Sequence, residues 1–194
     1  MQLGQLDLKS TLAQRMSVGE IRNLVFRVVV DGGDAGIGDL YSCACDSDDR
    51  VAYNALWVMT RFSDLELERI PAIRDELIDR LLVCGHAGKR RLILTLLARL
   101  EAEPDSLRTD YLDYCLGNII SDEPYAVRAL CMKQAYAQCR KFPDLMREFL
   151  SILELMEQGE LSPGLRTAKR NILKEIDRSN SRSSGRKKVL IERF

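Results

Sequence analysis

Apolar residues recur along most of the chain at the three- and four-residue intervals of amphipathic helices. Polar residues, Gly and Pro separate these stretches and supply helix starts and stops. The helix over 64–84 contains Pro71, where we expect a kink. The pattern predicts an all-α fold with helices over 6–16, 18–30, 39–45, 50–62, 64–84, 89–102, 107–120, 125–141, 145–158 and 164–178.

Two features near the N-terminus refine this prediction. Ser17 precedes a helix that carries Glu20 at its third position, the pattern of a capping box. The same helix ends in three β-branched residues, Val28 to Val30, so helix and short strand both stay open there. The following residues, 31–38, read Asp-Gly-Gly-Asp-Ala-Gly-Ile-Gly. They lack the pattern of a phosphate-binding loop and the ligand spacing of an EF-hand, and predict a solvated turn.

The helices recur in pairs at a nearly constant interval. The second helices of successive pairs align at Val51, Leu92, Val127 and Leu165, which are 41, 35 and 38 residues apart. A period near 40 residues with two antiparallel helices per unit is typical of HEAT and armadillo repeats.

The residues at these positions carry a family resemblance. Arg50-Val51-Ala52, Ala126-Val127-Arg128 and Gly164-Leu165-Arg166 each combine a small residue, a basic residue and an apolar seam. In this the chain resembles the HEAT/armadillo-type helical repeat family. The resemblance implies a right-handed α–α superhelix, a short solenoid of antiparallel helix pairs. We expect a single repeat domain over 1–178, with an N-terminal helical cap at 1–37 and repeats at 38–178.

Composition and charge change this picture mainly at the C-terminus. The chain is 46% hydrophobic and 30% charged with a net charge of +0, which is typical of a globular protein. Residues 162–194, however, hold ten basic and three acidic residues. Within them, the Ser-rich run 179–185 predicts that 179–194 is a basic flexible tail. Docking of the tail and homo-oligomerisation through it both stay open.

The sequence offers little catalytic chemistry. Cys43 and Cys45 lack the spacing of zinc ligands, and His86 is the only histidine. We therefore predict no catalytic residue, metal or cofactor, and an enzyme is the least supported class. No apolar run reaches the roughly 18 residues of a membrane span, so no membrane partner is expected. Without a secretory signal, the six cysteines are interpreted as buried thiols, and the expected location is cytoplasmic.

The candidate site residues are aromatic and basic. Tyr53 and Trp57 lie one turn apart, away from the main apolar face of helix 50–62, and either contact a partner in a groove or pack on the adjacent repeat. Four arginines near the starts of second helices form either a partner-binding stripe or an internal ladder with acidic residues, as the HEAT resemblance suggests. These are Arg50, Arg91, Arg128 and Arg166.

These features favour a non-enzymatic interaction or scaffold module that binds a protein or peptide on a helical-repeat surface. The alternative is a nucleic-acid-binding protein resembling the HEAT-like-repeat DNA glycosylases, which the basic C-terminal region keeps open.

Overall fold

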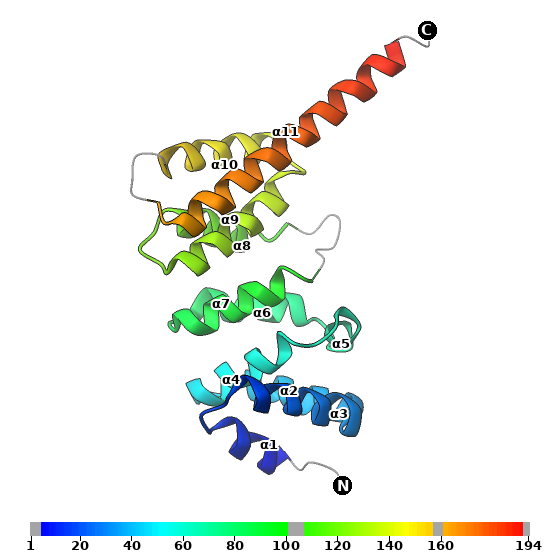
Figure 1. Cartoon of the computed structure of the whole chain (residues 1–194), viewed down its shortest axis with the longest axis vertical. Helices are drawn as coiled ribbons and strands as arrows, with labels where there is room; N and C mark the ends of the chain where they lie inside the picture. The colour runs from blue at the N-terminus through cyan, green and yellow to red at the C-terminus, as the bar shows by residue number, and fades with distance from the viewer. Residues whose placement is uncertain (1–4, 101–106, 157–160, 192–194) are drawn as a thin grey trace. The chain divides into compact units, whose positions relative to one another are not determined.

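The chain is helical throughout the part that the computed structural model describes, which is residues 5–100, 107–156 and 161–191 (Figure 1). This part contains eleven α-helices, one π-helix and no strand, so the predicted all-α fold is confirmed. The residues form two compact units, 1–111 and 112–194. The expectation of a single repeat domain and the handedness of its superhelix stay predictions.

Unit 1 stacks its second helices side by side. The α2 helix contacts α4, α4 contacts α7, and α6 pairs with α7. This is the arrangement that the repeat spacing predicts, because each second helix packs against the next one along the chain. The helices of unit 1 are α1 (Gln5–Leu12), α2 (Val18–Phe26), η1 (Arg27–Asp31), α3 (Gly33–Ala44), α4 (Asp49–Met59), α5 (Asp64–Glu68), α6 (Ile73–Val83) and α7 (Ala87–Leu97).

The α4 helix shows why stacking is needed. The apolar face predicted for it is buried, and every member is at most 2% exposed: Val51, Ala55, Val58, Met59 and Phe62. Leu56, outside that face, is also 2% exposed. A helix that buries side chains in two directions needs a neighbour on each side, and α4 contacts α3 and α7.

Side-chain caps define several helix starts as the sequence predicts. Ser17 and Glu20 form the capping box at α2: the Ser17 hydroxyl accepts from the Glu20 backbone N–H, and the Glu20 carboxylate accepts from the Ser17 N–H at 2.7 Å. Asp48 caps α4 by accepting from the N–H groups of Arg50 and Val51. These contacts satisfy N–H groups that have no partner within the helix.

The solvated turn predicted at 31–38 is wrong, and the valine run before it is neither α-helix nor strand. Val28 to Val30 lie in the π-helix η1, and α3 begins at Gly33, whose φ of 57° is left-handed. A Cβ on Gly36 would come within 2.5 Å of the Val28 carbonyl oxygen. The glycines therefore let η1 and α3 approach closely at a sharp corner. At this corner the two backbones contact each other instead of solvent.

The kink expected at Pro71 is a full break. The α5 helix ends at Glu68 and α6 starts at Ile73, preceded by Ala72 in the left-handed region at φ 51°. The break separates a one-turn helix from the first helix of the next pair.

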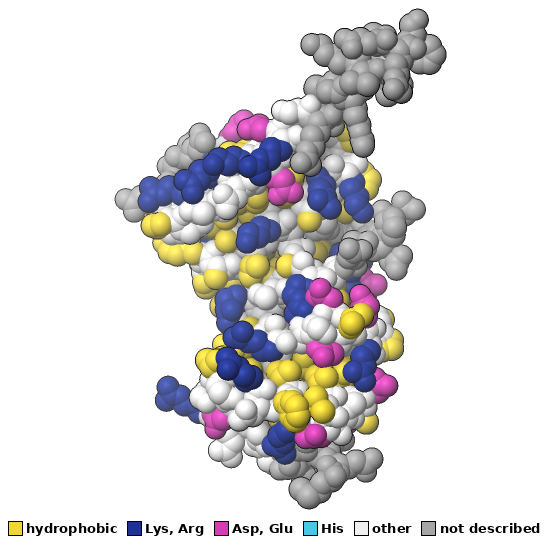
Figure 2. All heavy atoms as spheres, turned by 45° about the vertical axis from the view of Figure 1, so that its right-hand side comes forward, with side chains coloured by type: hydrophobic (Ala, Val, Ile, Leu, Met, Phe, Trp, Pro, Cys, Tyr) yellow, Lys and Arg dark blue, Asp and Glu magenta, His cyan; other side chains and the backbone are white. Residues whose placement is uncertain are grey.

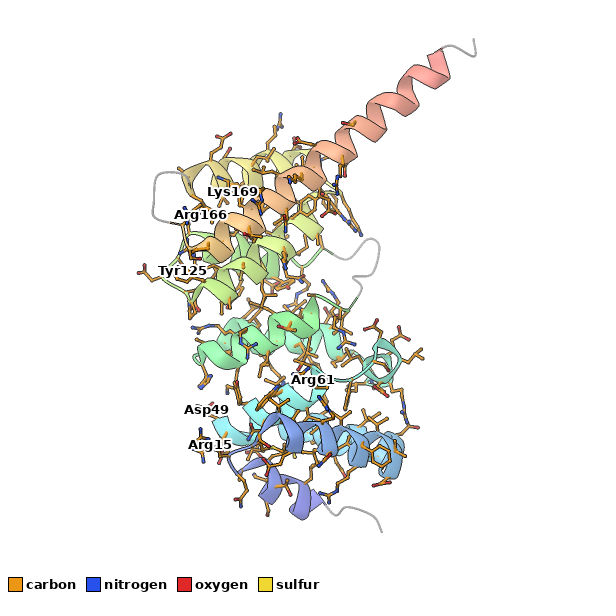
Figure 3. The ribbon with its side chains drawn as sticks, in the orientation of Figure 1. Arg15, Asp49, Arg61, Tyr125, Arg166 and Lys169 are labelled. Atoms are coloured by element: carbon orange, nitrogen blue, oxygen red, sulfur yellow. The ribbon has the colours of Figure 1, made fainter. Side chains whose placement is uncertain are left out.

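Unit 2 is a second set of helix pairs. It contains α8 (Thr109–Ile119, which starts in unit 1), α9 (Tyr125–Cys139), α10 (Pro143–Leu155) and α11 (Pro163–Ile191). The α9 helix contacts α10 and α11. In its core Tyr136 packs on Phe149 with ring centroids 6.1 Å apart. The buried Lys169 donates to the Leu153 carbonyl at 2.6 Å, which ties α11 to the end of α10 (Figure 3).

The α11 helix differs from the predicted linker, because it continues through 179–185 to Ile191. The Ser179 hydroxyl donates to the Glu175 carbonyl at 3.0 Å, and that of Ser181 to Asp177 at 2.8 Å. Serine hydroxyls bonded to the preceding turn are compatible with helix, so a Ser-rich composition does not by itself end one.

Candidate functional site

Polar contacts at both ends hold α4 and α7 parallel. At the start, the Lys89 ammonium donates to the Asp49 carboxylate at 2.5 Å. At the end, the Arg99 guanidinium donates to the Phe62 carbonyl at 2.6 Å and to the Asp64 carboxylate at 2.7 Å. Because start meets start and end meets end, the exposed sides of the two helices form a common surface.

Tyr53 and Trp57 lie at this junction, and both are partly buried. Their ring centroids are 6.3 Å apart, and the Tyr53 ring lies 6.0 Å from that of His86 at the start of α7. A Cβ on Gly88 would come within 2.9 Å of both the Tyr53 and the His86 ring, so glycine makes room for this contact. His86 itself caps α7, accepting from the Lys89 N–H through Nδ1 at 3.2 Å. Tyr53 thus packs on the adjacent repeat, while part of each ring stays accessible.

Arg50 and Arg91 lie on the same side of the two helices. Arg50 and Trp57 are seven residues apart, which is two turns, so they share one face of α4. Gly88 of α7 faces the Tyr53 ring, and Arg91 lies one turn further along the same side of α7. Arg50 is exposed and Arg91 partly exposed. Four of the six predicted site residues therefore lie on one surface of unit 1.

This surface continues onto α2 through a small pocket. Val18, Arg22 and Val25 of α2 line a cavity of about 240 Å³ together with Arg61, which follows the end of α4 (Figure 3). Val18 is 53% exposed. In the lower part of Figure 2, hydrophobic side chains reach the surface among both basic and acidic ones. We call the combined surface the second-helix face: Val18, Arg22, Val25, Arg50, Tyr53, Trp57, Arg61 and Arg91.

The sequence left open that the arginines form an internal ladder with acidic residues. Among the described residues, the arginines of this face do not pair in that way. Unit 1 does contain such a ladder, but other residues build it: Arg69 pairs with Asp34 and Arg99 with Asp64, each across 35 residues. Within the described residues, no carboxylate pairs with Arg22, Arg50, Arg61 or Arg91.

Arg128 and Arg166, the other two predicted site residues, belong to unit 2. The Arg128 Nε donates to the Ile119 carbonyl at 2.9 Å, so this side chain links α9 to the end of α8. Arg166 is exposed near the start of α11 (Figure 3). They are separate from the second-helix face of unit 1, and their role in binding stays a prediction.

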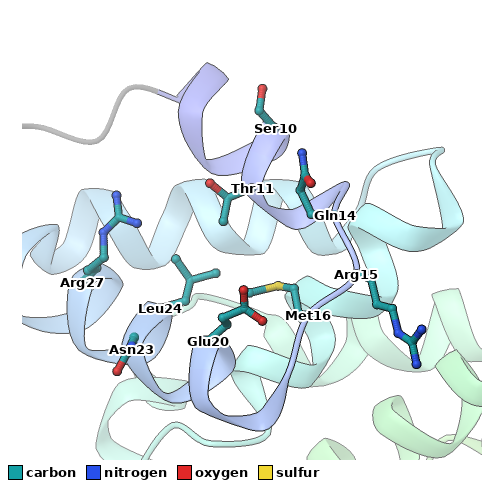
Figure 4. Close-up of a pocket in the computed structure, with 9 residues that line it drawn as sticks. All are labelled: Ser10, Thr11, Gln14, Arg15, Met16, Glu20, Asn23, Leu24 and Arg27. Carbon is teal, nitrogen blue, oxygen red and sulfur yellow. The ribbon is translucent and has the colours of Figure 1, made fainter.

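A larger pocket of about 600 Å³ lies between α1 and α2 (Figure 4). Its polar lining comes from Ser10, Thr11, Gln14, Arg15, Glu20, Asn23 and Arg27. It is wide open, and Glu20 is already engaged in the capping box. We therefore assign it no ligand.

The thiols and acidic groups do not form a metal site within the described residues, where no cluster of three or more potential ligands occurs. All six cysteines are free. Burial raises the pKa of Cys43, and that of Cys139 to about 11. In the same part of the chain, no helix is long and apolar enough to cross a membrane.

Comparison with known families decides the classification. The HEAT repeat domain family matches residues 8–176, which is most of the chain. The chain belongs to the HEAT repeat family. No curated protein and no solved structure matches it. The match begins well before residue 38, so it includes the helices that the sequence led us to treat as a cap, among them α2 of the second-helix face.

Sequence reasoning missed Arg22 and Arg61 as members of the HEAT-repeat surface. The sequence does contain a pattern that points to Arg22. Val18, Arg22 and Val25 follow the i, i+4, i+7 spacing of residues on one outward side of α2. Arg61 lies beyond the end of α4, so its position depends on the fold of the connection.

Proposed function

We propose that this HEAT repeat protein is a non-enzymatic interaction module that binds a protein or peptide on its second-helix face. The observation that carries the proposal is the combination of Trp57 and Tyr53 with arginines that have no carboxylate partner among the described residues. Trp, Tyr and Arg are the residues most enriched at the energetic centres of protein interfaces. The HEAT fold supports the same proposal, since stacked repeats present extended binding surfaces.

Two further elements belong to this proposal. Arg128 and Arg166 would contribute contacts from unit 2 to the same partner or to another one. A cytoplasmic location is supported by six free cysteines, which suit a reducing compartment.

The test is affinity capture from the natural host followed by measurement of the captured protein's Kd. The double variant Trp57→Ala/Arg91→Glu should weaken that Kd at least about tenfold, because it removes an aromatic anchor and reverses a charge. Val83→Ser is the matched control, since Val83 is 85% exposed but lies on α6, outside the face. A captured partner that binds both variants and the wild type equally would contradict the proposal.

Nucleic-acid binding is a second candidate because of one feature of α11. Arg166, Arg170, Lys174 and Arg178 follow at four-residue intervals on its exposed side, and none forms an ion pair within the described residues. A row of Lys and Arg side chains is visible in the upper part of Figure 2. Such a row favours phosphate contacts, and binding of an oligonucleotide would weaken steeply with salt. Replacing the four residues by Gln should abolish that binding, and absence of wild-type binding at low salt would eliminate this candidate.

A further inference from the structure

We infer that the second-helix face binds an acidic segment of the partner, one of whose apolar side chains enters the pocket between Val18, Arg22, Val25 and Arg61. This inference rests on the proposed function and specifies the chemistry of the partner. It is carried by the distribution of charge within unit 1, the size of the pocket and the spacing of the arginines.

The second-helix face is positively charged although unit 1 as a whole is negatively charged. Residues 1–111 contain 18 acidic and 14 basic residues, so unit 1 has a net charge of −4. The helices α2, α4 and α7 nevertheless contain only two acidic residues, Glu20 and Asp49. Glu20 is engaged in the capping box and Asp49 by Lys89. Asp48, the residue before α4, accepts from the Arg50 N–H as a helix cap, and the other acidic residues of unit 1 also lie outside these three helices.

The cations elsewhere in unit 1 are largely neutralised. Lys9 pairs with Asp46 at 2.5 Å, Arg99 with Asp64, and Arg108 with Asp79 and Asp110, each at 2.7 Å. These ladder and loop contacts pair cations outside the face with carboxylates, whereas the arginines of the face have no carboxylate partner among the described residues. A segment carrying carboxylates supplies the complementary charge, and arginine binds carboxylates with paired hydrogen bonds.

The pocket sets the size of the apolar group. Its volume of about 240 Å³ is below the roughly 300–1,000 Å³ of typical small-molecule sites. It suits a single aliphatic side chain, which would cover Val18 and Val25. Arg22 and Arg61 border the pocket, so the apolar residue is expected next to a carboxylate.

The spacing sets the length of the segment. Arg50 and Arg61 are eleven residues apart along α4 and its end, about 16 Å at the helical rise of 1.5 Å per residue. An extended peptide covers that distance in about five residues. Because α4 and α7 run parallel and Gly88 faces Tyr53, Arg91 is expected level with Trp57, each one turn further along its helix, so carboxylates near the middle and at both ends of such a segment would each reach a guanidinium.

An acidic peptide fits this face better than a nucleic acid does. Tyr53 is held between His86 and Gly88, which limits the stacking of bases on its ring. The net charge of −4 on unit 1 also opposes a long polyanion at distance, whereas a short segment gains from burial of its apolar side chain.

The experiment uses the full-length protein and synthetic peptides of about twelve residues, enough to span the face with margin. The first peptide alternates clusters of Glu with Leu, the second has Lys in place of Glu, and the third has Ser in place of Leu. Fluorescence anisotropy of the labelled peptide measures the Kd, and the emission of Trp57, the only tryptophan, reports occupancy of the face. An oligothymidylate of similar length is the fourth probe.

We expect the Glu/Leu peptide to bind at least about tenfold more tightly than the other probes and to shift the Trp57 emission. The variant Arg22→Gln/Arg61→Gln should weaken it about tenfold or more. Lys133→Gln/Arg140→Gln, which removes the same charge from an exposed position of α9 and from the exposed residue that ends it, should leave the Kd unchanged.

Three results of the peptide experiment would overturn the inference: equal binding of the Lys/Leu peptide, tighter binding of the oligothymidylate, or equal loss in the two charge variants. A different result would refute the proposed function: a natural partner whose Kd for Trp57→Ala/Arg91→Glu equals that for the wild type. A natural partner that depends on Trp57 and Arg91 but not on Arg22 and Arg61 would overturn this inference and leave the proposed function standing.

Discussion

Gly36→Ala should destabilise unit 1, while Gly38→Ala in the same helix should stabilise it. Both residues lie in α3, two positions apart, and both gain the same methyl group. A Cβ at position 36 would come within 2.5 Å of the Val28 carbonyl oxygen, whereas a Cβ at position 38 meets nothing within 4 Å. The two substitutions therefore differ only in what the methyl group contacts.

The magnitude follows from that contact. A carbon and a carbonyl oxygen normally come no closer than about 3.3 Å, so the η1 and α3 backbones would have to separate by about 0.8 Å. Overpacking of this kind costs about 1–3 kcal/mol, and the helix propensity of Ala offsets up to about 1 kcal/mol. We expect a net loss of about 1–2 kcal/mol at Gly36 and a gain of about 0.5–1 kcal/mol at Gly38.

Urea unfolding followed by Trp57 fluorescence measures both changes. Trp57 is the only tryptophan and lies in α4, which contacts α3, so its emission reports the unfolding of unit 1. If residues 31–38 were the solvated turn that their composition predicts, neither substitution would change the midpoint appreciably. Equal shifts, or a Gly36→Ala protein as stable as the wild type, would refute the close approach of η1 and α3.

Three further predictions test other contacts. Asn54→Ala should cost about 2–3 kcal/mol of unfolding free energy, because the buried Asn54 amide donates to the backbone carbonyls of Leu12, at the end of α1, and of Gln14. Asn118→Ala, which breaks bonds to Tyr114 and Ser121 only three or four residues away, should cost about 1 kcal/mol. The Lys89 ammonium holds the pKa of Asp49 below its usual range, so the midpoint difference between wild type and Asp49→Asn should be constant at pH 5–8 and vanish once the pH falls below that lowered pKa; a difference that persists in strong acid would contradict the ion pair. Burial raises the pKa of Cys139 to about 11, so this thiol should react with a disulfide reagent at pH 8 only on unfolding, and fast reaction of the native protein, followed by mass spectrometry, would contradict its burial.

The sequence predicted the features of the fold that local interactions determine. The capping box of Ser17 and Glu20 requires only residues three apart, and the buried face of α4 follows from the helical period. The corner at Gly36 was mistaken for a solvated turn because glycine serves both roles. What distinguishes them is the Val28 carbonyl of another helix, which no local pattern reveals.

The candidate site was predictable to a similar extent. Tyr53 and Trp57 were found because they lie outside the buried face of their own helix. Arg50 precedes the aligned Val51, whereas Arg128 follows the aligned Val127, and their contacts differ: Arg128 bonds to the Ile119 carbonyl, while Arg50 has no carboxylate partner among the described residues. Two positions on either side of the aligned residue point about 200° apart on a helix, so an arginine near the start of a second helix is not assigned to a ladder or to a binding surface by the repeat spacing alone.

The ladder explains why a unit with a net negative charge can present a cationic face. Its acidic residues lie where helices begin or where one repeat meets the next, as Asp34, Asp48 and Asp64 do, and there they cap N–H groups or pair with a cation of another element. Arg50 lies in the first turn of α4, but Arg22 and Arg91 lie beyond the first turns of α2 and α7 and Arg61 beyond the end of α4, so these three are not beside an acidic cap of their own helix. A binding surface of this kind therefore follows from the location of each charge along its helix rather than from the total charge. If this reasoning holds, reversing the net charge of unit 1 by substitutions on its first helices should leave the affinity for an acidic peptide within a fewfold of the wild type, whereas Arg22→Gln/Arg61→Gln should not.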